Sequence, residues 1–292
     1  MLISSRLMVV LALVAILTSL YTYFAVPFEW LAILILTALL YGVLSPSIAA
    51  RRLFFLATEA PHMSLFAIAL GILIYRTIFM FNEFVWAVIV GVILVNGVGH
   101  IIDLGVDPDV ATSVFVSFSA AGSVMATYYV LSKYSIQYNL WAVILGDPLL
   151  ATQQDVLTLA VIALAVVILG VLLYDVNVYM GSDFDHVKLS LSKLWLYDTV
   201  FYTMLAIASV ALLRFVGFIL EHVLLSLPAV IASNMVSSSR EAMLVSVLSS
   251  INSSIIGLIV AVKLNIAPAA SIGFITLVLY IVSLVMRRWV YG

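Results

Sequence analysis

The sequence predicts an all-α, polytopic membrane protein with about nine or ten transmembrane helices and one further short or re-entrant helix. Three observations support this fold class. Hydrophobic residues make up 65% of the 292 positions and charged residues only 9%, whereas soluble domains carry about 25% charged residues. The apolar residues gather in runs that are long enough to cross a bilayer. Basic residues cluster at the ends of these runs with a bias to one side.

Ten apolar runs divide the chain, and each predicts a membrane-spanning helix. They cover residues 7–26, 30–50, 58–76, 84–102, 110–131, 156–174, 194–213, 216–232, 243–262 and 266–286. We interpret the first run as a retained helix, because it is long for a signal peptide and no clear small-x-small cleavage site follows it. A shorter apolar piece at 140–145 cannot span a bilayer alone, so it predicts the short or re-entrant helix. The polar segment 175–193 predicts a loop that holds a short amphipathic helix.

The distribution of basic residues predicts the orientation of the chain. With the amino terminus inside, eight Lys and Arg residues lie at cytoplasmic ends and four at outer ends. The cytoplasmic ones are Arg6, Arg51, Arg52, Lys188, Lys193, Arg240, Arg287 and Arg288, and the outer ones are Arg76, Lys133, Arg214 and Lys263. This orientation places segments 175–193 and 233–241 in the cytoplasm and makes the protein a multi-pass protein of the cell membrane.

Composition also limits the possible functions. The net charge of −2 gives no reason to expect a nucleic-acid partner. The absence of cysteine excludes disulfides, thiol catalysis and zinc–thiolate sites. The chain has no G-x-x-x-x-G-K-S/T sequence, so it cannot bind nucleotide phosphates through that motif. We therefore expect no enzymatic activity in this chain and no stably bound cofactor.

The stretch 212–232 carries Glu221 and His222 side by side within an apolar run that continues to Pro228. A charged side chain costs at least about 2.5–3.5 kcal/mol at the bilayer centre, so such residues usually face a partner or a water-filled path. Contact with lipid headgroups is the alternative for this pair. Adjacent helical residues point about 100° apart, so only one of the two would face a given line.

Four segments carry a resemblance to a known family. They read RRLFFLATEAPHMSLFAIALG, DVATSVFVSFSAAGSV, ILGDPLLATQQDVLTLAV and LRFVGFILEHVLLSLPAVIA. Together they resemble the membrane subunit of ABC-type zinc and manganese importers, over about residues 30–288. We therefore expect a single transmembrane permease domain over 1–292, with 1–28 as an extra helix before the family-like core.

The resemblance implies both partners and cargo. Two permease chains would form a homodimer in the lipid bilayer, bind two separate ABC ATPase subunits, and receive zinc or manganese from an extracytoplasmic metal-binding protein. The family places its coupling element in the polar turn after Pro228. The resemblance thus implies an ATPase-docking role for five residues of that turn, for which an ordinary cytoplasmic loop is the alternative. They are Ser237, Ser238, Ser239, Arg240 and Glu241.

The candidate metal ligands are imidazoles and carboxylates, which suit zinc and manganese when thiolates are absent. His62 matches the family histidine, and Glu59 shares its helical face because the two are three residues apart. Thr58 stands where the family has its acid, so Glu59 would take that role after a small rotation of the helix. With Glu221 and His222 they form two acid/His pairs, which predict a site of two carboxylates and two imidazoles. A helix-end acid and a buried, hydrogen-bonded imidazole remain the alternatives for Glu59 and His62.

Other polar residues point to packing rather than transport. His100 and Asp103 predict a helix-end pair, and Asn96 and Asn252 predict hydrogen bonds between helices. Two other functions stay open: a permease for metal chelates of the siderophore or cobalamin type, and a proton-coupled secondary transporter.

Overall fold

The computed structural model describes residues 2–134 and 146–291, and every regular element in this part of the chain is helical. The predicted short helix at 140–145 lies outside the described residues. The elements are α1 (Leu2–Ala25), α2 (Phe28–Ala50), α3 (Phe54–Ile78), α4 (Glu83–Asp103), α5 (Pro108–Lys133), the 3-10 turn η1 (Pro148–Leu150), α7 (Gln153–Ser182), α8 (Phe184–Ser190), α9 (Leu194–Met235), α10 (Ser239–Leu264) and α11 (Pro268–Tyr291).

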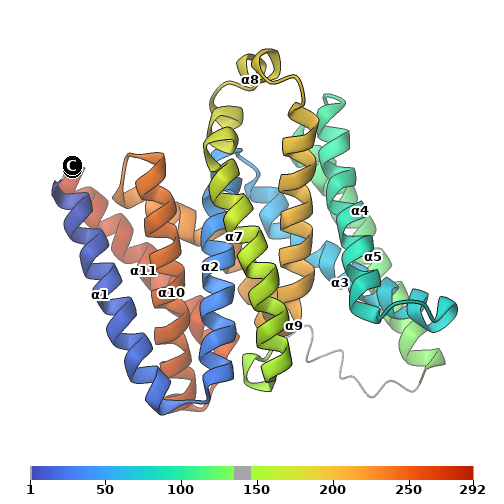
Figure 1. Cartoon of the computed structure of the whole chain (residues 1–292), viewed down its shortest axis with the longest axis horizontal. Helices are drawn as coiled ribbons and strands as arrows, with labels where there is room; N and C mark the ends of the chain where they lie inside the picture. Colours follow the sequence, from blue (N-terminus) through green and yellow to red (C-terminus); the bar gives the residue numbers. More distant parts are fainter. Residues whose placement is uncertain (1, 135–145, 292) are drawn as a thin grey trace.

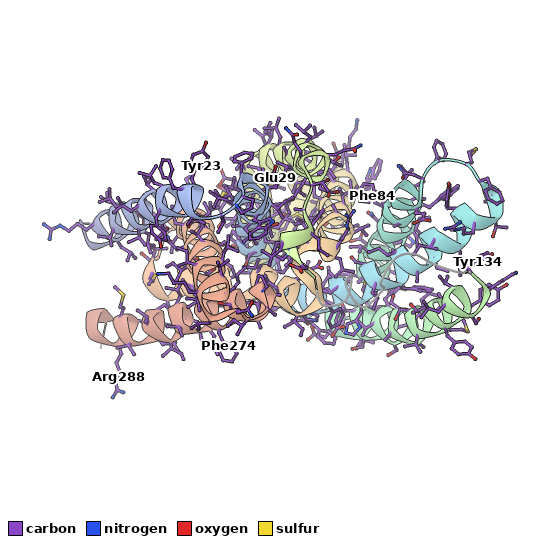
Figure 2. All side chains as sticks on the ribbon, turned by 90° about the horizontal axis from the view of Figure 1, so that it is seen from below. Tyr23, Glu29, Phe84, Tyr134, Phe274 and Arg288 are labelled. Carbon is purple, nitrogen blue, oxygen red and sulfur yellow. The ribbon has the colours of Figure 1, made fainter. Side chains whose placement is uncertain are left out.

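Figure 1 shows a bundle in which α1 and α11 form one edge and α4 and α5 the other. The central helices α2 and α9 are the most enclosed, whereas α1 and α7 expose most of their side chains. Seen from below in Figure 2, Tyr23 and Phe274 point outward from opposite sides of the α1–α11 edge. Both are more than half exposed. In a chain of this composition such apolar surface faces lipid.

Local sequence explains where several helices begin and end. Thr152 and Asp155 form a capping box at the start of α7, with reciprocal side-chain-to-backbone bonds. Asn82 caps α4, since its side chain accepts from the Val85 N–H. Asn265 ends α10 in a left-handed conformation, a common helix stop.

Two predicted helix boundaries, at the end of α7 and between α9 and α10, were wrong. The run predicted to end at residue 174 continues as α7 through polar residues to Ser182, and only then does the short predicted helix, α8, follow. The predicted turn at 233–241 is shorter, because Ser239 already begins α10 and Met235 still belongs to α9. Helices of membrane proteins can extend past the apolar core into water, so loss of hydrophobicity does not mark a helix end.

The longest helix, α9, consists of two halves that run in opposite directions. Gly217 interrupts it with φ 75° and ψ 161°, a conformation that is essentially limited to glycine. Before the break, Asp198 pairs with Arg51 at the end of α2. After it, the Ala229 N–H donates to Ser45 Oγ of the same α2 at 3.1 Å. The chain therefore returns along α2, and the predicted runs 194–213 and 216–232 are two crossings with no polar loop between them.

Gly217 has a second constraint in the loop before η1. Gly146 also has a positive φ, and a Cβ built there would lie 2.0 Å from the Gly217 nitrogen. The two backbones thus pack directly against each other at the end of the hairpin. Only glycine allows this approach.

Within residues 2–134 and 146–291, nine helices are long and apolar enough to cross a membrane. Because α9 crosses twice, these helices correspond to the ten predicted runs. The first of them is part of the bundle, since the Asn252 side chain of α10 donates to the Leu11 carbonyl of α1 at 3.0 Å.

Candidate functional site

Helix α3 and the second half of α9 bring three of the predicted metal ligands together. His62 Nε2 lies 3.6 Å from Glu59 Oε2 on the same face of α3. The His62 and His222 rings are 6.0 Å apart between centroids and nearly perpendicular. The side chains of Glu59 and His62 are 15% and 31% exposed, so the pair is accessible from one side.

Phe218 holds both imidazoles in place. Its ring lies 4.5 Å from that of His62 and 4.6 Å from that of His222. Its carbonyl oxygen lies 2.6 Å from His222 Nδ1. Because a carbonyl can only accept, Nδ1 carries the proton and the neutral ring keeps the Nε2 lone pair free. Metal-binding histidines commonly have this arrangement.

Glu221 occupies a different environment although it precedes His222 directly. Its side chain is fully buried and faces Tyr41 of α2 and Ser209 of the first half of α9. Both carboxyl oxygens, and the hydroxyls of Tyr41 and Ser209, are buried without a hydrogen-bond partner among the described residues. The structure therefore does not place Glu221 with the histidines.

The predicted four-ligand set is thus not assembled in this conformation. No group of three or more His, Asp or Glu side chains in the described part of the chain is close enough to hold one metal ion. The Glu59–His62 spacing nevertheless suits a shared ion, because two ligands at about 2.0–2.2 Å in tetrahedral geometry lie roughly 3.3–3.6 Å apart. Glu59 and His62 thus offer two ligands, and the imidazole of His222 lies nearby as a third. Such an incomplete site favours brief contact with an ion over tight binding.

Helix α8 and the α9–α10 turn lie at the same end of the bundle, the end that the basic residues predict to be cytoplasmic. Helix α8 stands outside the bundle in Figure 1, and its Leu189 side chain is 89% exposed. Ser237 and Ser238 are exposed in the turn. Among the other predicted docking residues, Ser239 accepts through its carbonyl from the Tyr174 hydroxyl at 2.8 Å. Arg240 pairs with Asp175 at 3.4 Å, and Glu241 is half-buried in the first turn of α10.

Two packing predictions were confirmed. Asn96 of α4 donates to Thr203 of α9 at 3.0 Å, and Asn252 joins α10 to α1 as described above. Sequence reasoning missed the pair of Arg51 with Asp198, in which both side chains are less than 10% exposed. It also missed Phe218, which looks like any other apolar residue of its run. A buried charge after the predicted start of run 194–213 was the available signal for Asp198.

Comparison with known proteins gives a match over nearly the whole chain. The family model described as "ABC 3 transport family" matches residues 7–287. The chain belongs to this family. The match to the ABC 3 family starts within α1 and ends within α11, so it includes every helix that contributes to the sites above. No curated protein sequence matches the chain significantly.

Two solved structures show the same fold. PsaBC from Streptococcus pneumoniae in complex with Fab superposes with a TM-score of 0.74 at 19% identity, over 87% of this chain and 89% of that chain. An inward-facing conformation of a metal-chelate type ABC transporter gives a TM-score of 0.67 at 15% identity, over 97% of this chain and 99% of the other. The ABC 3 chain is thus a multi-pass membrane protein with the architecture of an ABC permease.

Proposed function

We propose that this chain is the membrane-spanning permease of an ATP-driven importer for divalent metal ions such as zinc or manganese. The observation that carries the proposal is the meeting of Glu59, His62 and His222 within the membrane-spanning part of an ABC 3 family member. Imidazole and carboxylate are suitable ligands for both ions. ATP hydrolysis belongs to separate subunits.

The geometry supports a path in which the ion is passed and not stored. Glu59 and His62 would contact the ion together, and the free Nε2 of His222 would take part once the helices shift. Phe218 lies one turn nearer to Gly217, so it covers the histidines from the outer side. Gly217 separates the two halves of α9 and would let the second half move while the first stays packed. Glu221 is buried toward α2, and we assign it to packing in this conformation.

The test is ATP-driven uptake of radiolabelled zinc and manganese into vesicles that contain all subunits. We expect the double variant Glu59→Ala, His62→Ala to lower uptake at least about tenfold, which is about 1.4 kcal/mol. His100→Ala is the matched control, because His100 is an exposed histidine at the end of α4. Uptake by the double variant at the wild-type rate would show that the path lies elsewhere.

We further propose the partners of the permease. The whole chain would act as one domain, pair with a second copy, and receive metal from an extracytoplasmic binding protein. Two ATPase subunits would dock on the cytoplasmic surface formed by α8 and residues 237–241. The mass of the purified complex tests the stoichiometry, and a stable monomer with full ATP-driven transport would contradict the homodimer.

A test of the docking surface uses both of its parts. Arg240→Ala with Glu241→Ala, and separately Leu189→Asp, should weaken co-purification of the ATPase without loss of the membrane fold. If one variant shows normal co-purification and normal transport-coupled ATP hydrolysis, the residues changed in that variant do not belong to the docking surface.

A permease for metal chelates is the second candidate function. It is favoured by the similarity to the metal-chelate type transporter over nearly the full length of both chains. Competition of the radiolabelled ion by excess free metal, and not by its chelates, would decide for the free ion.

A further inference from the structure

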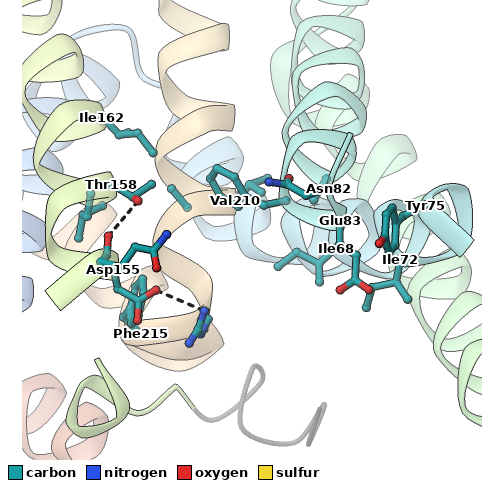
Figure 3. A pocket seen from close by; sticks show the side chains of 16 residues that line it. Ile68, Ile72, Tyr75, Asn82, Glu83, Asp155, Thr158, Ile162, Val210 and Phe215 are labelled. Atoms are coloured by element: carbon teal, nitrogen blue, oxygen red, sulfur yellow. Dashed lines mark hydrogen bonds and ion pairs between the residues drawn. The ribbon is translucent and has the colours of Figure 1, made fainter. Parts of the chain in front are cut away.

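A cavity of about 530 Å³ lies between α3 and α4 on one side and α7 and α9 on the other. Figure 3 shows Ile68 and Ile72 of α3 facing it from one side and Ile162 of α7 from the other. Its volume is within the range of small-molecule sites, about 300–1,000 Å³. All four helices line it near their outer ends, as the distribution of basic residues orients the chain.

The cavity is separate from the proposed metal path. Ile68 follows Glu59 by nine residues, which is about two and a half helical turns at 3.6 residues per turn. Glu59 and Ile68 therefore lie on opposite sides of α3, about 13 Å apart along the helix at 1.5 Å per residue. A metal ion in the cavity would need ligands of its own. Among the described residues, no group of three or more His, Asp or Glu side chains could hold one.

Two features of the cavity wall point to a lipid chain. The deep part is apolar, with Leu159, Ile162 and Val210 among its residues. On α7, Leu157 and Val161 alternate with the lining residues and are 64% and 71% exposed. In a spanning helix such side chains face hydrocarbon, so the lining residues of α7 lie directly beside its lipid-facing surface.

The rim of the cavity carries both signs of charge. Arg214 Nη1 lies 3.4 Å from Asp155 Oδ1, and Arg76 Nη2 lies 3.8 Å from Glu83 Oε1. Arg214 is 53% exposed, and a guanidinium has five N–H donors, so this one long contact leaves most of its donors available. Guanidinium groups bind phosphate in a two-point manner. Both oxygens of Asp155 already have partners, Arg214 and Thr152, whereas Glu83 has one long contact with Arg76 at 3.8 Å, so its carboxylate suits an ammonium group.

We propose that this cavity binds one glycerophospholipid with a primary ammonium headgroup. The phosphate would contact Arg214, the ammonium would contact Glu83, and one acyl chain would fill the apolar part. This site goes beyond the proposed transport function and does not depend on the identity of the cargo.

Native mass spectrometry of the purified permease–ATPase complex tests the proposal, with phosphatidylethanolamine and phosphatidylglycerol supplied in equal amounts. We expect one phosphatidylethanolamine per permease chain. Arg214→Gln and Ile162→Trp should each lower the lipid-bound fraction at least about fivefold. Lys263→Gln and Val161→Trp are matched controls, since they change an outer basic residue and a lipid-facing neighbour outside the cavity, and both should keep the lipid.

Two further arms distinguish other occupants. Millimolar inorganic phosphate should not displace the lipid. If phosphate does displace it, the cavity is a general anion site and the lipid proposal is wrong. A photocrosslinking amino acid at Thr158, which lines the cavity, should give an adduct with the mass of a lipid. A crosslink to a protein chain, equal retention of both lipids, or full retention by Arg214→Gln and Ile162→Trp would overturn the proposal. If Arg214→Gln fails to fold, Ile162→Trp against Val161→Trp decides alone.

Discussion

The two faces of the second half of α9 differ in exposure and in the residues that they contact. His222 lies by His62 and Phe218, at a site that is open from one side. Glu221, one residue earlier, is fully buried beside Tyr41 and Ser209. Two neighbouring ionisable residues of one apolar run thus lie in different environments, His222 beside the proposed metal path and Glu221 among buried helices. The difference teaches that an ionisable residue within a membrane span is a functional candidate only after its face is known.

The largest effect is expected when the bend at Gly217 is removed, because this bend sets the position of the second half of α9. Gly217→Val should prevent accumulation of folded protein, because Gly217 has φ 75° and packs against the backbone of Gly146. Backbone strain of this kind costs about 1–3 kcal/mol before the clash is counted. Size-exclusion chromatography after membrane extraction measures the effect. Gly273→Ala is the control, since an added Cβ there would meet nothing nearer than 3.9 Å.

A substitution on the open face, which carries His222, should lower metal transport and leave protein stability nearly unchanged. We expect His222→Ala to lower metal uptake at least about tenfold, while the midpoint of thermal unfolding changes by only a few degrees. The reason is that the proposed role of Nε2 is to contact the ion, whereas the packing of the ring against other helices is limited, among the described residues, to the edge-to-face contact with His62. An equal loss of uptake and of folded protein would instead assign His222 to packing.

A substitution on the buried face, which carries Glu221, should have only a small effect on metal transport. Glu221→Gln keeps the shape of the side chain and removes a carboxyl group that has no aligned partner among the described residues. Leaving such a group buried costs free energy, so we expect uptake within about twofold of wild type and equal or higher thermal stability. A tenfold loss of uptake in Glu221→Gln would show that this face reaches the path during the transport cycle.

The smallest expected effect concerns stability at the cytoplasmic turn. The Arg240–Asp175 pair is exposed, at 82% and 54% of the two side chains, and exposed pairs contribute about 0–1 kcal/mol. Arg240→Ala should therefore shift the unfolding midpoint by no more than a few degrees, whatever it does to ATPase docking. A large shift would mean that this turn stabilises α7 and α10, which would change the interpretation of the docking test.

The sequence by itself determined the membrane class, all ten crossings and the family. Long apolar runs and few charges allow only spanning helices, because backbone polar groups must be satisfied inside lipid. It also identified Glu59 and His62 as a pair, since residues three apart on one helix share a face. The membrane class, the crossings and the Glu59–His62 pair depend on composition and local periodicity, and the family depends on the resemblance of four segments. None of these needs knowledge of the neighbouring helices.

Only the tertiary structure decided which faces meet. Glu221 and His222 are about 100° apart, and the rotation of their helix is set by Gly217 and by packing against α2 and α3. The cavity brings the neighbouring helices α3 and α4 against α7 and α9, which follow much later in the chain, with lining residues from Ile68 to Phe215. Arg51 and Asp198 meet across 147 positions. Contacts of this kind come from the packing of whole helices, so no local pattern in the sequence could have predicted them.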